Sequence, residues 1–127
     1  MDTWTPGGGS KYRRGGPGDC VGTAVVYIAN SEGVWTAEIL LPENLVDMGP
    51  RKFAEGVVER DDQGRVATYR VAAGDVLEAI GKRFCTYDGG LLGNLNGYKN
   101  YESIQPGDVL VINPAAVPGF KYVAPDA

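Results

Sequence analysis

The stretch from Tyr69 to Pro114 constrains the fold of this chain most, because its apolar residues change from strand spacing to helix spacing and back. β-branched and aromatic residues at 68–71 predict a strand that Ala73-Gly74 ends. Asp75 and Glu78 form a capping-box pattern, so a helix is expected to start at Asp75. The next apolar residues recur at intervals of three and four, which predicts an amphipathic helix: Leu77, Ile80 and Phe84. The opposite face would be wet, with Glu78, Lys82 and Arg83.

A second short apolar stripe, at Leu91, Leu92 and Leu95, predicts another helix. Asn96-Gly97 would end this helix, because glycine readily takes the left-handed conformation. Pro106-Gly107 then predicts a turn, and 109–112 a buried strand. The expected order is therefore strand, helix, helix, strand.

This ordered set resembles the LysM domain family, over residues of about 67–114. The resemblance implies a βααβ fold and binding of N-acetylglucosamine polymers such as peptidoglycan and chitin. The residues that carry it span the whole segment: Tyr69, Val71, Gly74, Asp75, Leu77, Ile80, Phe84, Leu91, Leu95, Asn96, Ile104, Pro106, Gly107, Leu110, Ile112 and Pro114.

The resemblance also implies a glycan site, since sugar-binding LysM domains form a groove from the loop after the first strand and the loop after the second helix. Transferred to this sequence, the groove comprises Gly74, Asp75, Val76, Leu77, Asn96, Gly97, Tyr98, Lys99 and Ile104. Tyr98 or Tyr101 could stack on a sugar face. Val76 departs from the usual Thr or Ser. Gly81 departs from the usual Ala, at a cost of up to about 1 kcal/mol unless close packing requires a small residue.

The preceding region is rich in β-formers. Residues 22–29 and 34–41 predict an antiparallel hairpin around 30–33, and 42–48 could add one helical turn. Residues 53–60 and 65–71 predict a second hairpin that runs into the first LysM-like strand. We therefore expect an α+β fold in which N-terminal antiparallel β hairpins pack on a C-terminal βααβ module, with one continuous sheet.

Composition divides the chain into a Gly/Pro-rich arm at 1–19, a β-rich region at 20–66, the LysM-like module at 67–114 and a tail at 115–127. The arm cannot bury enough apolar surface to fold alone. One interpretation is a solvated charged arm. The other is an assembly arm that contacts neighbours through aromatic and arginine side chains: Trp4, Tyr12, Arg13 and Arg14.

Cys20 precedes the first predicted strand, and Cys85 follows the first LysM-like helix. A disulfide between them would close a long loop and contribute about 2–4 kcal/mol. It would also indicate an oxidising compartment or an extracellular particle. The alternative is two buried or half-buried thiols.

Sixteen acidic against twelve basic residues give a net charge of −4, which argues against nucleic acid as a partner. No apolar run is long enough to predict a membrane span, and no basic-then-apolar secretion signal is visible. The absence of histidine removes the usual general base and metal ligand, so we expect no catalysis, metal or cofactor. Candidate carboxylate pairs fall on predicted strands and turns, where they would face solvent: Glu38, Glu55, Glu59 and Asp61.

Two functions remain open. The chain could be a non-catalytic glycan-binding protein, or a structural component of a phage virion or similar assembly that uses the LysM-like module for protein docking or host-wall contact. Either function implies an extracellular, cell-wall or virion location. A single module gains avidity from repetition, so a homo-oligomer or larger assembly is expected for both.

Overall fold

The computed structural model describes residues 20–86, 89–99 and 103–125. The predicted assembly-arm residues Trp4, Tyr12, Arg13 and Arg14, and the candidate stacking residue Tyr101, lie outside this part of the chain. Within it, no helix is long and apolar enough to cross a membrane.

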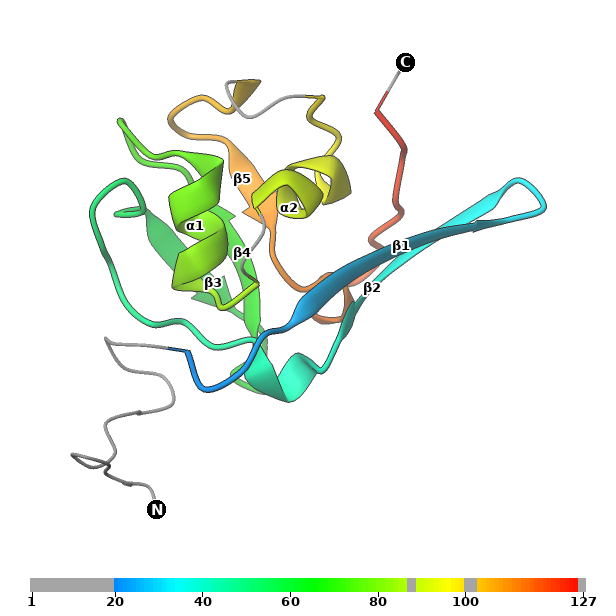
Figure 1. Cartoon of the computed structure of the whole chain (residues 1–127), viewed down its shortest axis with the longest axis horizontal. Coiled ribbons are helices and arrows are strands. Elements are labelled where there is room, and N and C mark those ends of the chain that lie inside the picture. The colour runs from blue at the N-terminus through cyan, green and yellow to red at the C-terminus, as the bar shows by residue number, and fades with distance from the viewer. Residues whose placement is uncertain (1–19, 87–88, 100–102, 126–127) are drawn as a thin grey trace.

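The predicted order of strand, helix, helix and strand is confirmed (Figure 1). It consists of β4 (Val66–Arg70), α1 (Leu77–Arg83), α2 (Gly89–Leu95) and β5 (Val109–Val111). β4 and β5 pair antiparallel, with Tyr69 opposite Leu110. The predicted stripe of Leu77, Ile80 and Phe84 is buried in the same core cluster as Tyr69 and Leu110, so the apolar spacing of the sequence describes the core correctly.

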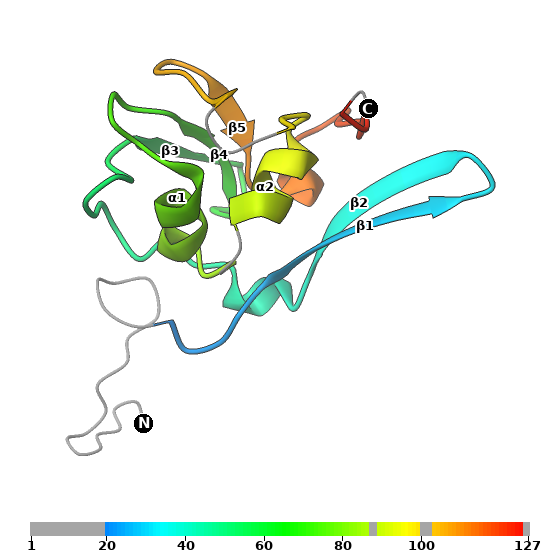
Figure 2. The ribbon, with the colours of Figure 1, turned by 45° about the horizontal axis from the view of Figure 1, so that its top comes forward.

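β3 (Val57–Arg60) pairs antiparallel with β4 and completes a three-stranded sheet in the order β3-β4-β5. Both helices lie on one face of this sheet (Figures 1 and 2). The turn between β3 and β4 is held by Asp61, whose carboxylate accepts from the backbone N–H groups of Gln63 and Arg65.

The first hairpin is β1 (Val25–Ser31) with β2 (Val34–Leu40), closed by Glu32 and Gly33 at positive φ. Its antiparallel pairing is as predicted. The second hairpin continues into the sheet of the βααβ module, as expected, but the first hairpin does not join it, because β1 and β2 form a separate two-stranded sheet. Both edges of β4 are already occupied by β3 and β5. Leu41 at φ 55 and the 3-10 turn η1 (Pro42–Asn44) also redirect the chain after β2.

The expected capping box at Asp75 is wrong. α1 starts at Leu77, after Val76 in extended conformation, and its first turn has no side-chain cap. The Asp75 carboxylate instead accepts from the Tyr69 hydroxyl and from the backbone N–H groups of Ala72 and Glu55. A buried phenol and two loop amides therefore compete successfully with the helix end for this acceptor.

α1 and α2 approach each other closely at glycines. A Cβ at Gly89 would lie 2.4 Å from the Leu77 carbonyl oxygen, and one at Gly81 would lie 3.1 Å from the Gly89 nitrogen. Close helix packing therefore accounts for glycine at position 81 in place of the usual alanine. α2 starts at Gly89 and contains the predicted apolar residues Leu91, Leu92 and Leu95.

The N-terminal region contacts the βααβ module at several points. Cys20 and Cys85 form a disulfide, with 5.7 Å between their Cα atoms. The Ala24 N–H donates to the Cys85 carbonyl at 2.9 Å, and the Met48 N–H to the Arg83 carbonyl at 2.9 Å. The base of the hairpin also contributes buried side chains to the shared core: Ala24, Val26 and Ile39.

Candidate functional site

The first wall of the implied groove is the turn between β4 and α1. Asp75 is 9% exposed and fixes this turn from inside, through its bonds to Tyr69, Ala72 and Glu55. The pKa of the Tyr69 hydroxyl is raised, first by burial and then by the hydrogen bond and the charge of Asp75. The hydroxyl therefore remains a donor to Asp75. Gly74 lies at φ 87 with open space where a Cβ would be. The turn is thus held from inside by the hydrogen bonds of Asp75, and it leaves free space next to Gly74.

The N-terminal region reaches this wall at Val76. The Val76 N–H donates to the Phe53 carbonyl at 2.9 Å, so this amide is engaged within the protein. Both side chains are exposed, Val76 by 43% and Phe53 by 49%, and the Lys52 ammonium lies 5.2 Å from the Phe53 ring centre. Phe53 has φ 69, so it sits in a turn and not in the predicted strand. The sequence showed no local signal for this contact.

The second wall follows α2 and is fixed by Asn96. Its side-chain amide donates to the carbonyls of Leu92 (3.1 Å) and Val111 (2.9 Å), and its side-chain oxygen accepts from the Val111 N–H at 2.7 Å. These bonds tie the end of α2 to β5. Gly97 follows at φ 83, again with open space around the Cβ position. The predicted glycine stop at the end of this helix is therefore confirmed.

Asp108 connects the two walls. Its backbone carbonyl accepts from the N–H of Val71, just before the first wall, at 2.9 Å. Its carboxylate accepts from the Tyr98 hydroxyl in the second wall at 2.6 Å. Burial, and then the hydrogen bond and charge of Asp108, raise the pKa of Tyr98 to about 12. The bonds from Tyr98 and from the Gln105 N–H lower the pKa of Asp108. Tyr98 therefore stays a neutral donor at physiological pH.

The predicted site residues fall into two groups. Buried or bonded supports include Asp75, Leu77, Asn96 and Ile104, with Leu77 only 1% exposed. The exposed residues are Gly74, Val76, Gly97 and Lys99, while Tyr98 is half-buried. Any ligand of this groove would therefore meet mostly backbone, one valine, one lysine and part of a tyrosine.

The C-terminal segment borders the second wall, which the sequence did not indicate. A hollow of about 350 Å³ lies between the end of α2 and residues 120–125, and Asn96 and Gly97 line it. The Tyr122 hydroxyl is hydrogen bonded to the Asn94 side-chain oxygen, and the Tyr122 ring lies 5.7 Å from that of Trp35 in β2. The segment therefore joins α2 to the first hairpin beside the groove.

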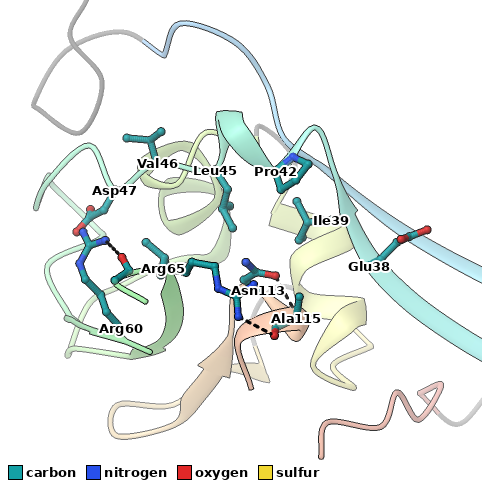
Figure 3. A pocket seen from close by; sticks show the side chains of 12 residues that line it. Glu38, Ile39, Pro42, Leu45, Val46, Asp47, Arg60, Arg65, Asn113 and Ala115 are labelled. Carbon is teal, nitrogen blue, oxygen red and sulfur yellow. Dashed lines mark hydrogen bonds between the residues drawn. The ribbon is translucent and has the colours of Figure 1, made fainter. Parts of the chain in front are cut away.

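A larger cavity of about 510 Å³ lies where β2 and η1 meet the β3–β4 turn (Figure 3). Its lining includes Ile39, Pro42, Leu45, Val46, Arg60, Arg65 and Asn113. Three of its charged groups bond to other parts of the protein. Arg65 donates to the carbonyl of Ala115 at 3.2 Å, Arg60 donates to that of Gly64 at 3.0 Å, and Asp47 accepts from Arg83. We therefore interpret the cavity as part of the contact between the N-terminal region and the LysM-like module.

Arg83 was expected on the wet face of α1, and this expectation is wrong. Its side chain is 4% exposed and pairs with the Asp47 carboxylate at 2.7 Å. Burial alone would raise the pKa of Asp47. The hydrogen bonds from Arg83 and the Gly49 N–H, together with the charges of Arg83 and Arg60, lower it below its ordinary value. This pair fixes the end of the helix that follows the first wall.

The comparisons with known proteins agree with this geometry. Residues 69–113 match the family model of the LysM domain, a binding domain that is generally non-catalytic and is associated with glycans such as peptidoglycan. No curated protein and no solved structure matches the chain. The predicted family is thereby confirmed for this segment: residues 69–113 are a LysM domain, placed between a disulfide-linked N-terminal region and a C-terminal segment that the family model does not cover.

Proposed function

We propose that this protein is a non-catalytic binding protein for N-acetylglucosamine polymers such as peptidoglycan, and that it binds them between the β4–α1 turn and the loop after α2. The observation that carries the proposal is the way both loops are fixed. Each is held by a polar side chain turned inward, Asp75 in one and Asn96 in the other, and each leaves an open glycine at the surface. Rigid loops bind ligands with less loss of conformational entropy.

The available groups suit a neutral sugar chain. The N–H groups of Gly97 and Tyr98 donate to carbonyls at the end of α2. The carbonyl oxygens of this loop are thus the candidates to accept from the N-acetyl amide and the hydroxyls of a sugar. Val76 offers an exposed apolar surface to the ring or the acetyl methyl group. Lys99, exposed on the second wall, could donate to sugar oxygens.

The N-terminal region contributes to the same site in this proposal. Phe53 lies next to Val76, and its exposed ring extends the first wall. Aromatic rings are suited to stacking on the apolar face of a sugar. The hydroxyl lost where Val76 replaces Thr or Ser is therefore offset by an apolar surface shared by Val76 and Phe53.

The disulfide supports a location outside the cell or at its wall, because such bonds persist in oxidising environments. The main support of the alternative, a virion-type assembly, is the arm at residues 1–19, which lies outside the described residues. A single groove with few polar groups is expected to bind weakly, so useful retention on a wall would come from several copies.

The test uses two glycines with nearly the same backbone conformation. Gly97 in the groove has φ 83 and Gly64 in the β3–β4 turn has φ 81, and each has open space around the Cβ position. Leucine at either position should lower the free energy of unfolding by a similar amount, about 1–2 kcal/mol, because its Cβ is strained in the left-handed conformation. Only Gly97→Leu would place a side chain in the groove.

Each variant is sedimented with insoluble peptidoglycan and with chitin, after circular dichroism has verified its fold. The wild type and Gly64→Leu should pellet with peptidoglycan, and Gly97→Leu should remain in the supernatant. Unchanged retention of Gly97→Leu and of Gly74→Leu would exclude this groove. A wild-type protein that pellets with neither polymer would refute glycan binding itself.

A further inference from the structure

The first hairpin projects from the rest of the molecule, with α2 on one side of it (Figures 1 and 2). Its register places alternate residues on opposite faces. The face that contains Val26 and Ile39 contributes to the core. The other face carries exposed apolar side chains: Val25 (37%), Tyr27 (48%), Val34 (63%) and Leu40 (38%). We call these residues the outer face of the hairpin.

The backbone edge of β1 is also open. Ser31 and Val34 flank a two-residue turn, so they form a hydrogen-bonded pair. In an antiparallel ladder such pairs alternate with pairs whose backbone N–H and C=O groups point away from the partner strand. The residues whose backbone groups point away from β2 are therefore Ala24, Val26, Ile28 and Asn30. Ala24 agrees with this pattern, since its N–H donates to the Cys85 carbonyl in the body of the protein. Beyond Ala24, no backbone hydrogen bond on this edge joins β1 to any other described residue.

The opposite edge is different. β2 contacts the 3-10 turn η3 (Pro114–Ala116), and Trp35 in β2 lies against Tyr122 of the C-terminal segment. The C-terminal segment therefore flanks β2. β1 approaches α2, but beyond Ala24 no backbone hydrogen bond joins its outward edge to another described residue.

β1 also lacks the features that normally block pairing with another chain. Exposed edge strands are usually protected by charged residues, proline or a bulge. The sequence of β1, VVYIANS, contains no charge, proline or glycine, and its register with β2 runs without a bulge. The acidic residues of the hairpin, Glu32 and Glu38, lie in the turn and in β2.

We propose that β1 pairs antiparallel with β1 of a second copy of this chain, around a two-fold axis at Ile28. This register joins all the outward backbone groups beyond Ala24, with Ile28 opposite Ile28 and Val26 opposite Asn30 of the second copy. On the outer face, Tyr27 lies opposite Ala29 of the second copy, a large side chain beside a small one. No charged side chain enters the strand pair, so two identical copies meet without like-charge repulsion.

The resulting four-stranded sheet joins two outer faces and stabilises a hairpin that would be marginal as two strands. It also places two LysM domains on one particle, which raises avidity for any repetitive ligand. The pairing itself does not depend on glycan binding, so it can be tested without a ligand.

The experiment is sedimentation equilibrium of the full chain over a range of concentrations. The expected limiting mass is twice the 13.5 kDa of one chain. Tyr27→Lys adds a lysine next to the pairing edge and should weaken the dimer by at least about tenfold, since edge lysines block strand pairing. Val34→Lys is the matched control. Val34 lies on the same outer face as Tyr27 and is more exposed, but it belongs to β2 and not to the pairing strand. Val34→Lys should therefore change the dissociation constant of the dimer by no more than about threefold.

Hydrogen exchange adds a residue-level measurement. The amides of Ile28 and Asn30 should become protected as the protein concentration rises, while the Ala29 amide, which faces β2, should be protected at all concentrations. Ile28→Pro removes an outward donor, which an edge strand tolerates, and should give a monomer with an intact disulfide. A wild-type monomer at every concentration would overturn the proposal. A dimer that resists both Tyr27→Lys and Ile28→Pro, or that Val34→Lys weakens equally, would also overturn it.

Discussion

Replacing Asp47 by asparagine tests how the N-terminal region stabilises the LysM domain. Arg83 at the end of α1 donates to both Asp47 carboxylate oxygens, at 2.7 and 3.2 Å, and to the carbonyls of Ala54 and Gly56, each at 3.0 Å. Its guanidinium also lies 5.4 Å from each of two aromatic ring centres. Asp47→Asn keeps the size of the side chain but removes the only carboxylate paired with this cation among the described residues.

The expected loss in the free energy of unfolding is about 3 kcal/mol. Removing one partner of a buried ion pair typically costs about 3–5 kcal/mol, because the other charge stays buried without compensation. We take the lower end because Arg83 retains its two backbone carbonyls, and because the asparagine oxygen can still accept one bond. Since small domains are stable by only about 5–15 kcal/mol, such a loss should be obvious.

The measurement is urea unfolding at about neutral pH, followed by circular dichroism. Glu78→Gln in the same helix is the control, since the Glu78–Lys82 pair is exposed and separated by 3.6 Å. An exposed pair of this spacing contributes about 0.3–0.5 kcal/mol. A loss for Asp47→Asn no larger than that of the control would refute the reasoning.

The pH dependence gives an independent check. The folded-state pKa of Asp47 lies below its ordinary value of 3.8, so the stabilisation is fully present above about that pH and is lost as pH falls through the folded-state pKa. The stability gap between the wild type and Asp47→Asn should therefore be constant from about pH 7 to pH 5. It should narrow below about pH 4. A gap that did not narrow in acid would show that the carboxylate charge does not stabilise the fold.

Three further substitutions test the supports of the candidate site. Serine at both Cys20 and Cys85 should cost about 4 kcal/mol by the chain-entropy estimate for a sequence separation of 65, measured by urea unfolding with and without reductant. Asn96→Ala removes the bonds between α2 and β5 and should cost about 2 kcal/mol, with faster amide exchange at the end of α2; unchanged exchange would contradict this role. Tyr69→Phe leaves Asp75 with one partner fewer and should cost about 1–3 kcal/mol while weakening retention on peptidoglycan; full stability would show that the hydroxyl is dispensable.

The order of elements could be predicted because its signals are local. The stripe of Leu77, Ile80 and Phe84 needs only helical spacing, and all three side chains are at most 1% exposed. The glycines at 97 and 107 mark turns by their own conformational freedom, and both have positive φ in the structure. The same local information was sufficient for the antiparallel pairing of the first hairpin.

The incorrect predictions concern side chains that can bond either to a neighbour in the sequence or to a distant residue. Asp75 matches a helix cap in sequence, but it bonds to the Glu55 amide, twenty residues earlier. Arg83 matches the wet face of α1, but its partner Asp47 lies 36 residues earlier. Periodicity and capping patterns describe only the chain within one or two turns, so neither partner could be found from them.

Three residues of the N-terminal region contact the same helix of the LysM domain. Sequence reasoning missed two of them, Phe53 and Asp47, but it proposed the third, Cys20, as the disulfide partner of Cys85. Phe53 meets the LysM domain at Val76, just before α1, while Asp47 and Cys20 meet it at Arg83 and Cys85, at the end of the same helix. The N-terminal region thus fixes α1 at both ends. Because α1 begins directly after the first wall of the groove, its position sets that of Val76. In the proposed glycan site, the N-terminal region would therefore act in two ways: Phe53 would extend the binding surface, and the contacts at both ends of α1 hold the helix that follows the first wall.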